Sequence, residues 1–218
     1  ETMPRFPRLS IASKLYAIFA LLATATVVLA LVAVVAARRH AALTDEFEAA
    51  LQGSQNVERI NGLIYAVVME SRGVYMSEDA PSRRKYADGL LKFNDQIAQI
   101  INAWERTIAA QHADQFKPFA ARIRQFIEFR KELARLGVEV GQSAGREWGD
   151  NDANRTVRIA LNEDLAMLGA LYSKEARDAY AKIDSGIDFT AWLMTMLGGI
   201  AIALGVSGAW MLRRTVVH

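Results

Sequence analysis

The sequence contains no cysteine, three histidines and four prolines in 218 residues. Without cysteine, the chain has no disulfide framework, no thiol chemistry and no Fe–S ligands. The three histidines, His40, His112 and His218, are far apart, so we expect no histidine metal site. The prolines leave long stretches without a helix breaker, which favours long helices.

Features of enzymes and of nucleic-acid-binding proteins are also missing. The sequence has no Ser/His/Asp arrangement at a credible spacing, no phosphate loop and no metal cluster. The net charge of +2 is too small to indicate a nucleic-acid partner. No segment alternates apolar and polar residues with turn pairs, which argues against a strand-based sensor such as PAS. We therefore expect an all-α protein that is not an enzyme and has no catalytic residues, metal or cofactor.

Two long uncharged runs stand out. Residues 15–37 contain 23 residues without a charge, and residues 189–212 contain 24. About 20 apolar residues span a bilayer as a helix. A buried core helix is the alternative for either run, and a signal peptide is a further alternative for the first. We interpret both as transmembrane helices, because the first run is long for a signal peptide.

The flanking charges indicate an orientation. Arg213 and Arg214 follow the second run, while Asp184 and Asp188 precede it. Because basic flanks prefer the cytoplasm, we place residues 1–14 and 213–218 inside and residues 38–188 outside. Arg38 and Arg39 point the other way. The predicted location is the bacterial inner membrane, with a periplasmic segment between two spans.

The segment 38–188 has the periodicity of four helices. The first continues from the membrane to Ser77, and the second covers about 82–111 with a heptad-like apolar spacing. The third begins near Asp114, a good N-cap residue, and is followed by a glycine-marked loop over 141–152. The fourth begins at 150–152 and has no proline before the second span, so the two form one helix. This predicts an up-down four-helix bundle flanked by two transmembrane helices.

Within residues 57–77 the apolar side chains form two stripes. The broad one is the predicted core, and Ser71 falls within it, where its hydroxyl can bond back to the preceding turn. The narrow one steps by 4, 3, 4 and 3, as in a coiled-coil interface. We interpret it as the contact with a second copy in a symmetric homodimer, since small residues permit close packing. A solvated face with chance glycines is the alternative. The narrow stripe consists of Gly62, Ala66, Met69, Gly73 and Met76.

Arg72 falls between the two stripes, in line with Asn61 and Tyr65. An arginine in the groove between two copies can hold a carboxylate bidentately. The alternative is an ion pair within its own bundle.

A second polar group begins the fourth helix. Asn154, Arg155 and Arg158 lie in its first turns, after Asp150, Asn151 and Asp152, whose ordinary role is helix capping. We expect the arginines of the first and fourth helices to meet in one cationic pocket for an anionic small molecule.

These features resemble the N-terminal sensor region of bacterial methyl-accepting chemotaxis proteins of the alphaproteobacterial type. The resemblance covers the whole chain and is carried by NGLIYAVVMESRGVYMS (61–77), KYADGLLKFNDQI (85–97), NDANRTVRIALNEDL (151–165) and LRRTVV (212–217). The last segment is similar to the entry of a HAMP linker, so we expect the natural chain to continue beyond residue 218.

The resemblance implies a dimeric receptor in chemotaxis, in which ligand binding shifts helix four and its span along the membrane normal. It also implies a cytoplasmic kinase and an adaptor as partners. Amino-acid receptors of this family carry several arginines on helix one near the dimer contact. Here only Arg72 matches, with Arg59 well below it, so no amino-acid ligand is carried over. The alternatives are the sensor half of a histidine kinase or diguanylate cyclase, and a structural bundle without a ligand.

Overall fold

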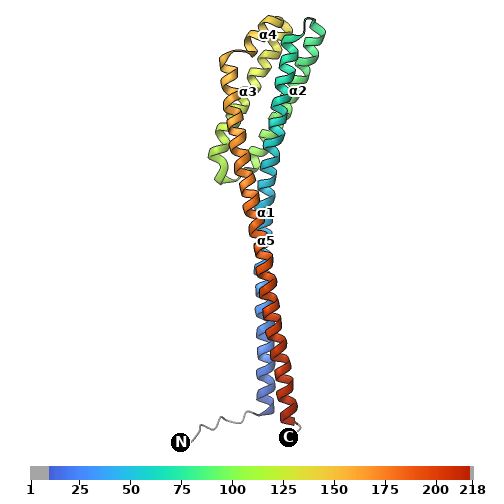
Figure 1. The fold of residues 1–218 in the computed structure, drawn as a ribbon, viewed down its shortest axis with the longest axis vertical. Helices are drawn as coiled ribbons and strands as arrows, with labels where there is room; N and C mark the ends of the chain where they lie inside the picture. The colour runs from blue at the N-terminus through green and yellow to red at the C-terminus, as the bar shows by residue number, and fades with distance from the viewer. Residues whose placement is uncertain (1–9, 217–218) are drawn as a thin grey trace. The chain divides into compact units, whose positions relative to one another are not determined.

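The computed structural model describes residues 10–216, and within that range every regular element is helical. The predicted all-α fold is confirmed, with five α-helices where four were expected (Figure 1). Predictions that fall on residues 1–9 and 217–218 lie outside the described range. The elements are α1 (Ile11–Met76), α2 (Ala80–Thr107), the 3₁₀ turn η1 (Ala110–His112), α3 (Ala113–Glu139), α4 (Gln142–Gly149) and α5 (Asp152–Val216).

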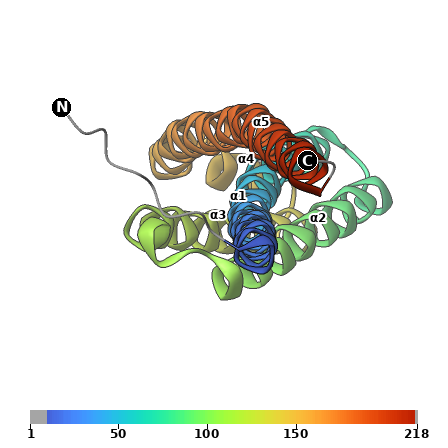
Figure 2. The ribbon, with the colours of Figure 1, turned by 90° about the horizontal axis from the view of Figure 1, so that it is seen from below.

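The chain divides into two compact units. The first, Glu48–Ala176, contains the end of α1, all of α2, α3 and α4, and the start of α5. Its helices share one apolar core, and α2 lies beside α3 (Figure 2). The predicted core stripe of α1 is confirmed for five residues, which are buried at helical spacing, while Leu63, Val68 and Tyr75 are half-buried. The buried members of that stripe are Val57, Ile60, Ile64, Val67 and Val74.

Short polar segments set the helix boundaries of this bundle. α1 ends at Met76, next to the predicted Ser77, and the Asp79 side chain caps α2 by accepting from the Ser82 N–H at 2.7 Å. The predicted N-cap at Asp114 is wrong. η1 leads directly into α3, so His112 is the N-cap residue and Asp114 lies in the first turn.

The predicted loop over 141–152 is also wrong, because most of it is the helix α4 (Figure 1). Gly141, with a φ of 134°, makes the sharp turn out of α3. Gly145 then faces Gly137 of α3, and a Cβ on Gly145 would lie 3.0 Å from the Gly137 Cα. Gly145 and Gly137 therefore permit α3 and α4 to approach closely. In the sequence alone, glycines used for helix packing look the same as glycines used in a turn.

Polar side chains of the bundle bond to backbone carbonyls, and those of Asn94 and Arg83 join different helices. Asn94 of α2 is buried, and its Nδ2 donates to the Ile127 carbonyl of α3 at 3.2 Å. Ser71 of α1 donates to the Val67 carbonyl at 2.7 Å, as predicted for a hydroxyl in the core stripe. Arg83 donates to the Gly137 carbonyl at 3.2 Å and to the Glu78 carbonyl at 2.6 Å, which joins the α1–α2 turn to α3.

The second unit contains the described residues up to Phe47 and those from Arg177 onward. Here α1 and α5 are long apolar helices, and none of the residues in their most apolar 18-residue windows is buried. Gly208 of α5 lies against Ile18 of α1, and Phe47 packs on Tyr180 with ring centroids 6.3 Å apart. By length and composition these two helices could be membrane spans.

Candidate functional site

Arg130 is a buried arginine in the middle of α3. Only 5% of its surface is exposed, and its guanidinium lies over the Phe126 ring at 5.1 Å. Nη1 donates to the Ser71 hydroxyl at 3.3 Å. In the described part of the chain Arg130 forms no ion pair, and its buried Nε has no hydrogen-bond partner. Buried charges are normally paired, so an unpaired buried arginine is unusual for a protein core.

A small polar pocket adjoins this arginine. It has a volume of about 40 Å³ and brings three arginines together with one carboxylate. The pocket is therefore cationic and of a size suited to a single small polar group. Its lining residues are Arg130, Gly149, Asp150, Asn151, Asn154, Arg155 and Arg158.

The surroundings act on the charge of Arg130. Burial lowers the pKa of its guanidinium to about 10, and the neighbouring charge of Arg158 acts in the same direction. Tyr75 and Asp150 oppose this lowering of the pKa, though with smaller effect than burial. Arg130 therefore remains a cation at neutral pH, in surroundings that disfavour the charge and would favour a bound anion.

The wall of the pocket is held by hydrogen bonds around the start of α5. Asn151 caps α5, because its Oδ1 accepts from the Asn154 N–H at 2.8 Å. The buried Asn154 donates from Nδ2 to the Trp148 carbonyl at 2.6 Å. Trp148 in turn donates from Nε1 to the Phe129 carbonyl of α3 at 2.9 Å. α3, α4 and α5 are thus joined directly beside Arg130.

The structure brings together only half of the predicted ligand-binding residues. Asn154, Arg155 and Arg158 line the pocket. Arg72 and Tyr65 are exposed, Asn61 is half-buried, and none of the three lines it. The predicted arginine of the first helix, Arg72, is therefore not part of this pocket. The arginine that joins Arg155 and Arg158 comes from α3.

Sequence reasoning missed Arg130, although its position carries a signal. It follows Phe126 by four residues and precedes Leu133 by three, and both of these are buried. The heptad-like spacing of the α3 core therefore passes through an arginine. A charge at a core position marks either a buried ion pair or a binding site.

The predicted dimer stripe has mixed surroundings within the chain. The Tyr86 ring of α2 fills the space beside Gly73, so packing within the bundle accounts for this glycine. Gly62 has no atom within 4 Å of where a Cβ would lie, and Met69 and Met76 are 63% and 70% exposed. Ala66 is half-buried. Most of the stripe is therefore an open surface of α1.

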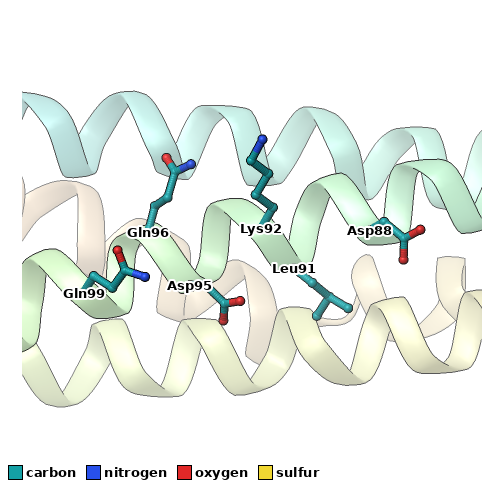
Figure 3. Close-up of a pocket in the computed structure, with 6 residues that line it drawn as sticks. All are labelled: Asp88, Leu91, Lys92, Asp95, Gln96 and Gln99. Carbon is teal, nitrogen blue, oxygen red and sulfur yellow. The ribbon is translucent and has the colours of Figure 1, made fainter.

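Two other concave surfaces are weaker candidates for a binding site. The six residues of one shallow surface all come from α2, and their side chains spread apart along the helix (Figure 3). In the second unit, a groove of about 870 Å³ lies between residues 33–43 and 183–194 and is lined mainly by apolar side chains. Within the described residues no group of His, Cys, Asp and Glu is placed to hold a metal ion. The Arg130 pocket is the strongest candidate site.

Comparison with known proteins adds no assignment. No protein-family model, curated protein or solved structure matches this chain.

Proposed function

We propose that this chain is the input module of a transmembrane chemoreceptor, which senses a small anionic molecule outside the cytoplasm and signals to a cytoplasmic domain. The observation that carries the proposal is the continuity of α5. The helix begins with the pocket residues Asn154, Arg155 and Arg158 and continues unbroken through the apolar residues 189–212. A ligand that moves the start of this helix therefore acts on the same helix that carries the second span.

The apolar half of α5 and its counterpart in α1 support a membrane location. Large apolar side chains in both are exposed, such as Val35 at 66% and Ile202 at 70%. Apolar surface of this extent is stable when lipid covers it. In this proposal residues 15–37 and 189–212 span the bacterial inner membrane, and residues 38–188 are periplasmic.

The absence of cysteine permits a direct test of this topology. Ser10→Cys and Ser143→Cys place one thiol at each predicted side, since both residues are exposed. In intact cells a membrane-impermeant maleimide should label Ser143→Cys and spare Ser10→Cys until the cells are opened. If Ser143→Cys stays unlabelled by the maleimide in intact cells, the proposed orientation is contradicted.

Signalling is tested by joining the chain to the cytoplasmic part of a known chemoreceptor. The proposal expects kinase output to change when organic acids are added, and Arg130→Met to remove that change. The same fusion made to a histidine kinase or a diguanylate cyclase tests the alternative outputs. A fusion that inserts correctly and responds to no acid would contradict an anion-sensing role.

The proposed homodimer through α1 has its own test. Gly73 is unsuitable because Tyr86 occupies the adjacent space, whereas Gly62 is open. Gly62→Cys should form a disulfide-linked dimer in membranes on mild oxidation, because the two copies of this residue face each other. Lys92→Cys, on the exposed face of α2, is the matched control and should remain a monomer. Equal cross-linking of the two variants would reject the α1 contact.

A further inference from the structure

We infer that the Arg130 pocket holds one carboxylate group of a small organic acid, with Arg130 as its anchor. This inference rests on the proposed function only for its signalling role, because the binding itself is a property of the bundle. The remainder of the acid would stay at the mouth of the pocket, where the exposed Arg155 lies.

The size of the pocket selects the group that enters. Its volume of about 40 Å³ compares with roughly 10–15 Å³ that a cavity needs to hold one water molecule. One carboxylate fits this space, and the body of a larger molecule stays outside it. The same space admits the head of a larger acid whose chain extends outward.

The residues that line the pocket favour a ligand group that is negatively charged and planar. Three arginines surround the pocket against the single carboxylate of Asp150. Guanidinium groups bind carboxylates through two parallel hydrogen bonds, and such charge-assisted bonds are about twice as strong as neutral ones. Arg130 forms no ion pair among the described residues, so an anion would not have to displace a carboxylate from its guanidinium.

The Ser71 contact determines what an anion would change. The bond from Arg130 Nη1 to the Ser71 hydroxyl measures 3.3 Å, which is long for a hydrogen bond. A carboxylate competes for the same guanidinium with a stronger interaction. Binding would therefore weaken a tie between α3 and α1 and draw α3 toward the start of α5, where Arg155 and Arg158 face the anion.

The test uses the purified full chain in lipid nanodiscs, with unfolding followed by tryptophan fluorescence. The probes are acetate, succinate, inorganic phosphate and sulfate, with acetamide as the uncharged counterpart of acetate and chloride for ionic strength. A probe at 100 times its dissociation constant should raise the melting temperature by roughly 5 °C or more. We expect acetate or succinate to do so and acetamide and chloride to have no effect. Trp148, joined to Asn154, should report binding through its own emission.

Variants separate the anchor from its surroundings. Arg130→Met should abolish the shift while raising the melting temperature of the free protein, because it removes an unpaired buried charge. Arg130→Lys keeps the charge without the planar fork and should weaken binding at least tenfold. Ser71→Ala removes the competing acceptor and should tighten binding. Arg72→Ala is the matched control, since Arg72 is exposed and does not line the pocket, and should bind like the parent chain.

The outcomes are distinct. A shift by phosphate or sulfate but by neither acid would overturn the choice of carboxylate. A shift by acids that survives Arg130→Met would overturn the site while leaving an anion sensor possible elsewhere on the chain. The absence of any shift would overturn the inference. Binding that follows these expectations in a receptor fusion without output would keep the site and reject the signalling role.

Discussion

At the end of the bundle where α2 passes through η1 into α3, Trp104 packs on Phe116 and Tyr172 with ring centroids 5.0 and 5.6 Å apart. His112, at the same end, lies 3.2 Å from the Glu175 carboxylate. At the other end, α3 buries Arg130 without a carboxylate partner, next to a small pocket. The first end meets the usual requirements of dense aromatic packing and, in the part of the chain described, of no unpaired buried charge. The second departs from them with a buried charge, and such departures are expected where a protein binds something.

The largest effect is expected at the aromatic end. Trp104→Ala would leave a cavity among several rings and should lower the free energy of unfolding by about 3–5 kcal/mol. Chemical denaturation followed by far-UV circular dichroism measures this loss. Leu91→Ala, at an exposed position of α2, is the control and should change stability by less than about 0.5 kcal/mol. Similar losses in both variants would mean that this end is not a packed core.

At the arginine end, the close approach of α4 to α3 can be broken directly. Gly145→Val would place side-chain atoms against the Gly137 backbone, which cannot rotate aside, and should lower stability by about 1–3 kcal/mol. The Trp148 emission should shift as α4 moves. Gly186→Ala, at a glycine with open space around it, should be neutral or slightly stabilising. An unchanged Gly145→Val protein would contradict the packed α4.

Tyr172 is the polar exception at the aromatic end, because its buried hydroxyl has no hydrogen-bond partner among the described residues. Tyr172→Phe should leave stability unchanged at neutral pH or raise it by up to about 1 kcal/mol. Burial, and then the charge of Glu175, raise the pKa of Tyr172 to about 12. The parent chain should therefore lose stability relative to the variant as the pH rises from about 10 to 12. Parallel pH profiles would show that this hydroxyl is solvated.

The smallest effect is expected at the exposed α1–α2 turn. Asp79→Ala removes the cap of α2 and should lower the melting temperature slightly. Hydrogen bonds from Ser82 lower the pKa of Asp79, so its contribution is complete above the usual aspartate pKa. That contribution is lost as the pH falls through the lowered value, and the two proteins should then converge. A difference that persists in acid would assign the effect to backbone entropy instead.

The sequence predicts the long elements well, because their periodicity extends over many turns. The core positions of α1, from Val57 to Val74, follow from spacing alone. The continuity of α5 follows from the lack of a breaker between Asp152 and the apolar run. α4 escapes prediction because Gly141, Gly145 and Gly149 indicate a loop, and only the tertiary contact of Gly145 with Gly137 shows that glycine permits helix packing there.

The candidate site is predictable only in part, for a related reason. Spacing places Asn154, Arg155 and Arg158 in the first turns of one helix, and these residues do share a pocket. Spacing fixes the face of a helix that a residue occupies, but not which helix lies opposite. For that reason the sequence places Arg72 between two faces of its helix but does not say which helix it contacts. Arg130 is not singled out, because it lies within an apolar stripe.

The buried amide of Asn94 has a mechanical consequence for the proposed receptor. Its bond to the Ile127 carbonyl fixes one level of α2 against one level of α3, since sliding by a fraction of a turn would leave the Asn94 amide unpaired inside the core. Apolar side chains packed in ridges impose no such penalty for a small slip. We expect α2 and α3 to keep this register as one unit, while movement of α5 would have to break its own ties to α3, such as the ion pair between Arg122 and Asp164.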